Sequence, residues 1–500
     1  MLSEIRVFVA ILLLWGCVFS SLGKDHSTAG RSRRQTSVVN QRRVCFYGGW
    51  SRERLGAGRF DASFINGTLC THVVYAFAKI VNGIMVPDNN DSAQEEVYYA
   101  ELQAVRNQYP HLKILLSVGG WLLGSGPFSS FARNYSQRLT FASHALADLR
   151  RWGFDGLDVN WEYPGSRYGS SAMDKVNYVE LLKDIYFAFE VEGMMTGLQR
   201  LLLTATVPAG RIAIDNGFNI PEISNWLDFV IIMTYDYHGS WLHSPTGHNA
   251  PLYPEEQEVN KELNVDWSVM YWIKHGYPPE HIVLGLAAYG RTYTLYNGNW
   301  THIGAPAAGG GGMGDYTKTD GINAYYEICS KLDNGYSLVW NDAQKVHYAF
   351  NNQTMDWVGF DSPKSIAIKT KYAMSLGLGG IMMWSLDLDD FGGSFCNQSQ
   401  YPLLTAAYLV QTSNLTVEAV EKIYPMDGTV YQPKVRPECT LNFTCPEIHG
   451  LYPHPCPDSC DRFIHCAFYR PNEKMCPPGL LYSKELQWCE YPWMVTCTTF

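Results

Sequence analysis

The most informative stretch of the chain runs from residue 155 to residue 164 and reads DGLDVNWEYP. Side chains on a β-strand point alternately to opposite faces, so Asp158, Asn160 and Glu162 share one face and apolar residues share the other. Burying polar groups on an apolar strand is costly unless they are paired or used. One interpretation is a hydrogen-bond network that locks the fold. We favour a catalytic site, because Glu162 lies at the exit of the strand.

Two carboxyl groups on one strand face also predict unequal pKa values. Like charges in a confined site disfavour joint ionisation, so we expect the charge of Asp158 to raise the pKa of Glu162 to near neutral pH. Asn160 lies between them and links them. A protonated carboxylic acid in a cleft can act as a general acid, which is the requirement for cleaving a glycosidic bond.

The elements that must position this strand follow a regular pattern. Eight short apolar runs alternate with segments of helical character, which predicts a parallel sheet covered on both faces. Eight such units fit a closed (β/α)8 TIM barrel, in which chemistry lies at the carboxyl ends of the strands. The runs are residues 44–47, 72–78, 113–118, 154–162, 202–207, 229–235, 281–286 and 379–384.

Residues 287–378 are too many for one connecting helix. We expect a small α+β insertion after the seventh strand, at about residues 290–365, which forms one wall of a cleft. A strand pair is predicted near residues 338–340 and 347–350. The glycine run at residues 309–312 has no Lys-Ser/Thr after it, so it predicts a flexible surface loop and not a phosphate-binding loop.

Four motifs in chain order carry a family resemblance. Residues 155–164 resemble the catalytic signature of glycoside hydrolase family 18 chitinases. The stretches LLSVGGW (115–121), MTYD (233–236) and WSLDLDDF (384–391) resemble motifs of the same family. The resemblance covers roughly residues 43–400, within a barrel domain that we place at 43–410. It implies substrate-assisted catalysis, in which the N-acetyl oxygen of the substrate attacks the anomeric carbon.

The resemblance also implies the roles of individual residues. Glu162 would protonate the leaving oxygen and later activate water, Tyr235 would hydrogen-bond the acetamido group, and Trp384 would form the floor of the subsite that holds the distorted sugar. Trp50 and Trp121 would stack on further sugars, with core packing as their alternative role. The other residues expected to line the site are Met233, Asp236, Tyr163, Tyr289 and Arg291. No metal and no cofactor are implied.

Asn160 departs from the family pattern, because active members carry Asp at this position. Asn160 can still accept a hydrogen bond from the acetamide N–H and donate one to Asp158, but the negative charge is lost. Losing one preorganised electrostatic contact costs on the order of 100- to 1,000-fold in rate. Two readings stay open: a chitinase with reduced activity, and a chitin-binding lectin on the chitinase scaffold.

The N-terminus predicts export. Arg6 precedes an apolar run at residues 7–18, so residues 1–23 are expected to be a cleaved signal peptide. Residues 24–42 are predicted to be a pro-segment or a solvated tail. The chain has 13 cysteines, and Cys17 would leave with the signal. The remaining even set and the N-x-S/T sequons fit a secreted, extracellular glycoprotein.

The C-terminal residues 439–500 have the cysteine density of a disulfide scaffold and follow residues 411–438, which are predicted to be a linker or an extended tail of the barrel. The spacing of six cysteines resembles the peritrophin-A type chitin-binding module of carbohydrate-binding family 14. That resemblance implies the pairs Cys445–Cys466, Cys460–Cys497 and Cys476–Cys489, and leaves Cys439 and Cys456 as a further possible pair. The stacking candidates of the module are Tyr482, Trp488 and Tyr491. In the barrel, the family pattern implies Cys45–Cys70, and Cys329–Cys396 would tie the insertion to the barrel.

The charge balance of the chain limits its partners. It carries 38 basic and 48 acidic residues, a formal net charge of −10, which argues against a nucleic-acid binder. No segment after the signal is long and apolar enough to span a membrane. The expected partner is chitin or chito-oligosaccharides, bound by a monomer.

Overall fold

The computed structural model describes residues 41–88, 92–242, 245–256, 258, 260–426, 443–456, 462–467, 469–476, 481–490 and 495. The expected signal peptide at 1–23 and nearly all of the expected tail at 24–42 lie outside these residues. Among the described helices, none has the length and apolar character needed to cross a bilayer.

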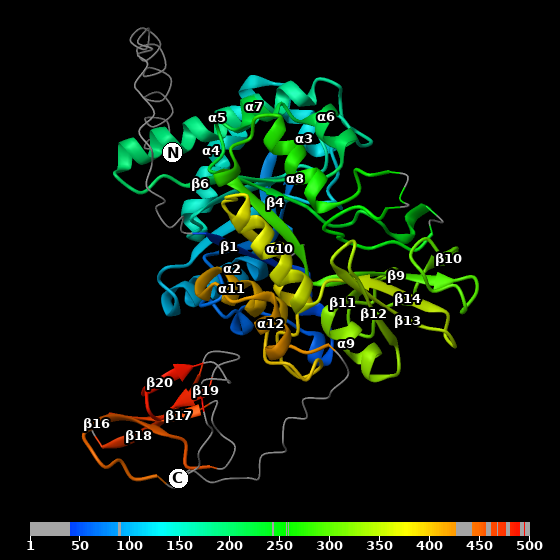
Figure 1. The fold of residues 1–500 in the computed structure, drawn as a ribbon. Coiled ribbons are helices and arrows are strands. Elements are labelled where there is room, and N and C mark those ends of the chain that lie inside the picture. The colour runs from blue at the N-terminus through cyan, green and yellow to red at the C-terminus, as the bar shows by residue number, and fades with distance from the viewer. Residues whose placement is uncertain are drawn as a thin grey trace, which may run out of the picture. The chain divides into compact units, whose positions relative to one another are not determined.

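Eight parallel strands close into a barrel, which confirms the predicted fold (Figure 1). Each strand pairs with the next in chain order, and the last pairs with the first. The short antiparallel strand β3 (Ile84–Pro87) extends β2. The barrel strands are β1 (Arg42–Gly48), β2 (His72–Val81), β4 (Lys113–Gly119), β5 (Gly156–Asn160), β6 (Leu202–Val207), β7 (Phe229–Ile232), β8 (Ile282–Ala287) and β15 (Gly380–Trp384).

Two strands are shorter than their apolar runs predict. β5 ends at Asn160 and β7 ends at Ile232, so Glu162 and Tyr235 lie just beyond the strands. At the end of β5, the Asn160 carbonyl oxygen accepts a hydrogen bond at 2.9 Å from the N–H of Gly120, the residue directly after β4.

Helices cover the outside of the barrel. Local interactions set both ends of α4. At its start, the Asn134 side chain accepts a hydrogen bond from the Gln137 N–H. At its end, Gly153 takes up a left-handed conformation with a φ of 79°. The helices outside the insertion are α2 (Ser92–Gln108), α3 (Gly126–Ala132), α4 (Tyr135–Trp152), α5 (Asp174–Thr196), α6 (Arg211–Gly217), α7 (Ile220–Ile223), α8 (Val265–Lys274), α10 (Pro363–Ser375), α11 (Pro402–Ser413) and α12 (Val417–Ile423).

The insertion after β8 forms a sheet of its own in the order β10-β9-β14-β13-β12, with β11 paired to β9. Its buried side chains, such as Tyr325 and Val358, join the apolar cluster of the barrel. Its elements are β9 (Tyr289–Leu295), β10 (Ala307–Gly310), β11 (Ile322–Ala324), α9 (Tyr325–Asp333), β12 (Ser337–Asn341), β13 (Val346–Asn351) and β14 (Asp356–Phe360).

Half of the glycine run is strand and not the flexible loop that the sequence predicts. Gly309 and Gly310 belong to β10 and pair with β9. A Cβ atom at Gly311 would lie 2.6 Å from a carboxylate oxygen of Asp356, so close backbone packing accounts for the glycine there.

The first part of residues 411–438 is an extended tail of the barrel and not a linker. The chain remains helical through α11 and α12, and Val420 and Tyr424 are buried. The Lys364 ammonium on α10 pairs with the Glu421 carboxylate on α12 at 2.7 Å. The barrel region therefore extends at least to residue 424, because α12 packs against α10.

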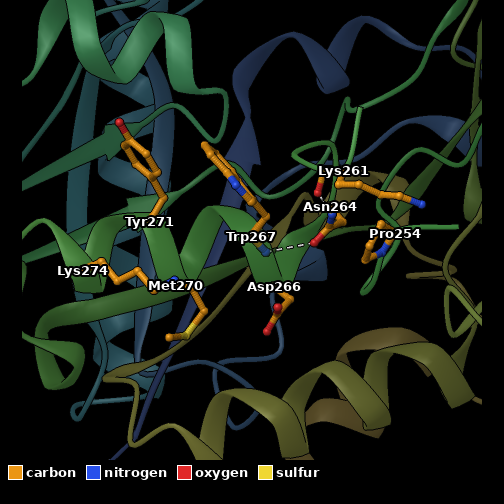
Figure 2. Close-up of a pocket in the computed structure, with 8 residues that line it drawn as sticks. All are labelled: Pro254, Lys261, Asn264, Asp266, Trp267, Met270, Tyr271 and Lys274. Atoms are coloured by element: carbon orange, nitrogen blue, oxygen red, sulfur yellow. Dashed lines mark hydrogen bonds between the residues drawn. The ribbon is translucent and has the colours of Figure 1, made fainter. Parts of the chain in front are cut away.

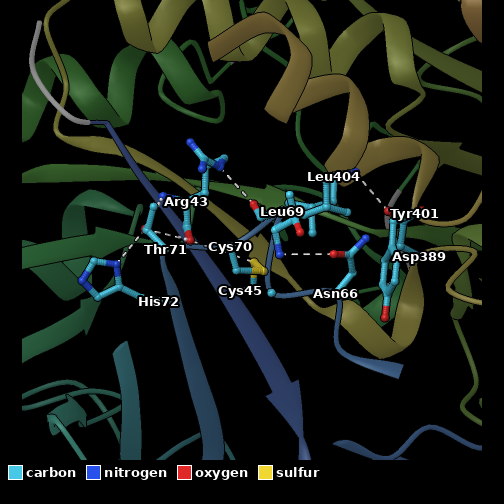
Figure 3. Close-up of a disulfide and its surroundings, with 12 residues drawn as sticks. Arg43, Cys45, Asn66, Leu69, Cys70, Thr71, His72, Asp389, Tyr401 and Leu404 are labelled. Carbon is cyan, nitrogen blue, oxygen red and sulfur yellow. Dashed lines mark hydrogen bonds between the residues drawn. A yellow bond between two sulfur atoms is a disulfide. The ribbon is translucent and has the colours of Figure 1, made fainter. Parts of the chain in front are cut away.

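Two disulfides tie the barrel region. Cys45–Cys70 joins β1 to the segment that leads into β2, where the Arg43 guanidinium also donates a hydrogen bond to the Leu69 carbonyl oxygen at 3.0 Å (Figure 3). Cys329–Cys396 links α9 of the insertion to the segment after β15. Both pairs are those expected from the sequence.

The described part of the C-terminal module contains two small antiparallel sheets. They contain β16 (His449–Pro453), β17 (Arg462–Ala467) and β18 (Arg470–Met475), and β19 (Leu481–Ser483) with β20 (Trp488–Glu490). The expected bridges Cys445–Cys466 and Cys476–Cys489 are formed, and Cys456 is also disulfide-bonded. Cys439, Cys460 and Cys497 lie outside the described residues.

The three stacking candidates of the module have different outcomes. The prediction that Tyr482 is an exposed stacking platform is wrong. The residue is 5% exposed, and its ring stacks on that of Phe463 with 5.0 Å between the ring centroids. In a module with few apolar residues, this ring is needed for the core. Trp488 is 58% exposed, as a platform requires. Tyr491 lies outside the described residues.

Candidate active site

Asp158 lies inside the barrel and is fully buried. Its carboxylate accepts hydrogen bonds from the hydroxyl groups of Ser117 at 2.7 Å, Thr204 at 2.8 Å and Thr206 at 3.0 Å. Burial raises the pKa of Asp158, and these hydroxyl groups oppose the rise. The expectation that Asn160 donates to Asp158 is wrong, because neighbouring strands supply the donors instead.

Glu162 is buried at the mouth of the barrel and is only 7% exposed. Burial raises its pKa from 4.5 to about 7. The nearby Arg167 and a hydrogen bond from the Asn160 side chain lower the pKa, while Asp236 raises it further. The predicted rise in the pKa of Glu162 is therefore present, but its predicted cause is wrong. Burial makes the largest contribution, and the negative charge that raises the pKa further is that of Asp236 and not that of Asp158.

Two buried polar atoms beside Glu162 have no hydrogen-bond partner among the described residues. They are Oδ1 of Asn160 and the hydroxyl oxygen of Tyr235, whose residues are 1% and 8% exposed. Tyr235 lies within electrostatic reach of Glu162 and Asp236, and burial raises its pKa well above the ordinary value. Buried polar groups without partners cost free energy, so both atoms are available to a ligand that carries a donor and an acceptor.

Asp236 is fixed by three neighbours. Its carboxylate accepts hydrogen bonds from the Tyr289 hydroxyl at 2.6 Å and the Arg291 guanidinium at 2.8 Å. Its backbone N–H donates to the Asn249 side chain at 2.9 Å, with φ of 60° at Asp236. Asp236, Tyr289 and Arg291 were expected in the site, and the structure brings them together. Asn249 was missed, since nothing in its sequence context distinguishes it.

An aromatic cluster centres on Trp384 at the end of β15. Its ring lies 6.0 Å from Phe77 and 6.3 Å from Trp50 between centroids, and Phe77 stacks on Trp50 at 5.9 Å. Trp50 is 44% exposed, which excludes core packing as its main role. Phe77 was missed although it lies in a predicted strand, because an aromatic residue there is usually interpreted as core.

Trp121 follows β4 and is 58% exposed. The guanidinium of Arg167 lies 3.7 Å from the centroid of the Trp121 ring and also donates hydrogen bonds to the carbonyl oxygens of Trp121 and Glu162. Arg167 was missed by the sequence analysis and connects these two loops. Met233 and Tyr163 are half-buried, at the ends of β7 and β5, next to Tyr235 and Glu162 respectively.

The site is therefore a barrel mouth with one buried acid whose pKa is raised to about 7, two unsatisfied polar atoms and several aromatic rings. Residues 42–389 match the family Glycosyl hydrolases family 18. The chain belongs to this family. Residues 445–497 match the Chitin binding Peritrophin-A domain, so the predicted chitin-binding module is confirmed as well.

The names of two curated relatives differ, because one is a chitotriosidase and the other is a chitinase-3-like protein. Chitotriosidase-1 of Mus musculus is 40% identical over 460 residues, which cover 90% of this chain and 95% of the relative. Chitinase-3-like protein 2 of Homo sapiens is 38% identical over 368 residues, which cover 73% of this chain and 90% of the relative.

Solved structures show the same contrast. The Group IV chitinase of Ostrinia furnacalis in complex with allosamidin has a TM-score of 0.71 and 36% identity, over 75% of this chain and 100% of that chain. Human YKL-39 is described as a pseudo-chitinase with retained chitooligosaccharide binding properties. Its structure has a TM-score of 0.69 and 37% identity, over 73% of this chain and 98% of that chain. Membership in the family is thus compatible with enzymes and with binding proteins.

Proposed function

We propose that the protein is a secreted chitinase that hydrolyses β-1,4 linkages between N-acetylglucosamine units, with activity reduced by Asn160. The observation that carries the proposal is Glu162, a buried carboxyl group whose pKa lies at about 7 beside two unsatisfied polar atoms. A general acid is most effective when its pKa lies near the working pH.

The proposed reaction has two steps. The proton of Glu162 passes to the glycosidic oxygen while the carbonyl oxygen of the substrate's acetamide bonds to the anomeric carbon, so the leaving sugar departs with that proton. Water then attacks the same carbon and gives a proton back to Glu162, while the bond from that carbon to the acetamide oxygen breaks and the acetamide is restored. The configuration is retained, because each step inverts it. The Tyr235 hydroxyl donates a hydrogen bond to the acetamide oxygen, and Oδ1 of Asn160 accepts one from its N–H.

Asn160 determines how fast this reaction runs. The acetamide becomes positively charged as the oxazolinium ion forms, and a neutral amide offsets less of that charge than a carboxylate does. A deficit on the order of 100- to 1,000-fold in rate is the expected consequence. Hydrogen bonds to the substrate survive the change, so binding is preserved better than turnover.

The second candidate is a lectin that binds chito-oligosaccharides without cleaving them. The observation that favours it is the same neutral Asn160, together with the similarity to human YKL-39, which is described as a pseudo-chitinase. We favour the enzyme because Glu162, Asp158, Tyr235 and Trp384 are all present. The C-terminal module would hold the same polymer and raise its effective concentration at the cleft.

The first experiment compares the unmodified chain with Glu162→Gln on a soluble chitin tetramer. The substitution removes the proton donor and keeps the shape, so hydrolysis is expected to fall by roughly 100- to 10,000-fold while tetramer binding persists. Product release is measured by chromatography and binding by calorimetry. Absence of product from both proteins, with binding intact, would establish the lectin.

A further inference from the structure

A pocket of about 200 Å³ lies on α8, and none of its lining residues belongs to the candidate active site (Figure 2). It is lined by Pro254, Lys261, Asn264, Asp266, Trp267, Met270, Tyr271 and Lys274. We propose that this pocket is a second sugar-binding site, which takes one N-acetylglucosamine unit of a chitin chain. The choice of sugar rests on the proposed function.

The pocket contains a pre-arranged aromatic wall. Trp267 stacks on Tyr271 at 4.7 Å between ring centroids with 23° between the planes, and Tyr271 lies 4.0 Å from the ring of His275. The three residues are spaced by four, so they follow one face of α8. Figure 2 shows the side chains of Trp267 and Tyr271 projecting from the same side of the helix.

The Tyr271 ring is held by a hydrogen bond before any ligand binds. The Tyr271 hydroxyl donates a hydrogen bond to the Asp215 carboxylate of α6 at 2.5 Å. Tyr271 covers one face of the Trp267 indole, and no second ring among the described residues stacks on the other face. A fixed aromatic face is a suitable platform for the apolar face of a pyranose ring, because little side-chain freedom is lost on binding.

The charged groups of the pocket suit a neutral ligand. Lys261, Lys274 and Asp266 contribute charges of both signs, so the lining does not select a strongly charged ligand. Asp266 accepts a hydrogen bond from the Tyr372 hydroxyl at 2.8 Å, and Asn264 caps the helix through the Trp267 N–H at 2.9 Å. These bonds hold the frame of the pocket in place.

Chitin is the occupant that the rest of the chain favours. The same polypeptide carries a glycosyl hydrolase family 18 barrel and a chitin-binding module, so a polymer bound by either one is present at high effective concentration. A site for a single sugar ring binds weakly by itself. When the ligand is a polymer, the pocket strengthens retention because the barrel or the module already holds the polymer near it.

The test is hydrogen exchange of the full chain, measured by mass spectrometry, with and without a soluble chitin hexamer. We expect slower exchange both in peptides covering residues 156–168 and in peptides covering 261–275. Protection of 156–168 alone would overturn the second site and leave the proposed function standing. Protection of neither region would contradict the proposed function itself. Equal protection of 261–275 by a maltose hexamer would overturn the assignment to N-acetylglucosamine.

A matched pair of variants gives an independent readout. Trp267→Ala is expected to weaken retention on insoluble chitin by roughly 3- to 10-fold. Trp300→Ala removes a tryptophan that is 47% exposed in the insertion, and its retention is expected to match the unmodified chain. Equal retention of the two variants would overturn the proposal.

Discussion

The barrel and the C-terminal module are stabilised in different ways. The apolar cluster of the barrel includes residues from Val44 to Tyr424, whereas that of the module has three buried members among the described residues, Cys445, Ile464 and Cys466. A large core can bury Asp158, Asn160 and Glu162 and still fold. A small module cannot, so it relies on disulfides, and its chemistry is limited to exposed groups such as Trp488.

Removing one disulfide from each region tests this difference most strongly. The bridges Cys45–Cys70 and Cys445–Cys466 close loops with sequence separations of 25 and 21, so each constrains the unfolded chain by a similar amount, about 3 kcal/mol. We expect the double Ser variant of the module bridge to lose its folded module and its retention on insoluble chitin. The double Ser variant of the barrel bridge is expected to stay folded.

Limited proteolysis and chitin pull-down of the two variants check this expectation. Hydrolysis of the soluble tetramer by the module variant serves as the control, because the barrel is intact in it. An intact module after loss of Cys445–Cys466 would mean that the small apolar cluster is sufficient without that bridge.

The buried acid of the barrel predicts a pH-dependent stability. The folded protein holds the Glu162 proton more tightly than the unfolded chain, because the pKa is about 7 in the fold and 4.5 ordinarily. The free energy of unfolding therefore falls as the pH rises from about 4.5 to 7, by on the order of 3 kcal/mol. Glu162→Gln removes this dependence.

Denaturant unfolding of both proteins at pH 4 and pH 8 measures the effect. We expect similar free energies of unfolding at pH 4 and a more stable Glu162→Gln variant at pH 8. The burial of Asp389, whose pKa is also raised to about 7, affects both proteins equally and cancels in the comparison. A constant difference at the two pH values would mean that Glu162 does not titrate as a buried acid.

The smallest expected effect concerns the exposed ring of the module. Trp488→Ala should weaken binding to insoluble chitin by roughly 3- to 10-fold without unfolding the module, because the side chain is 58% exposed. Leu486→Ala is the matched control, since this apolar side chain is 49% exposed nearby in the sequence. Binding curves on chitin beads provide the measurement, and equal losses in the two variants would exclude a specific stacking role.

The sequence predicts the parts of the barrel that depend on local patterns. All eight strands lie within or near their apolar runs, and the alternation around Asp158 correctly places Glu162 at the barrel mouth. Contacts between distant segments were not predictable. The hydroxyl donors to Asp158 come from β4 and β6, and Asp236, which raises the pKa of Glu162, follows β7.

Other errors arise where one residue type serves two roles. Tyr482 is an aromatic residue of the kind that stacks on sugars, but its ring is buried inside the module. The segment after residue 410 has the polarity of a linker, so the sequence left open a linker and a tail of the barrel, whereas in the fold α12 packs on α10 and Val420 is buried. In both cases burial decided the outcome, and burial depends on partners that are distant in the sequence.

The central claim is that one missing charge at Asn160 limits the rate in an otherwise complete site. The most direct measurement is the kcat of the unmodified chain and of Asn160→Asp on the soluble tetramer at the pH optimum of each. We predict measurable turnover for the unmodified chain, an increase on the order of 100- to 1,000-fold for Asn160→Asp, and little change in tetramer binding. No turnover by the unmodified chain, or no gain on restoring the carboxylate, would contradict the account.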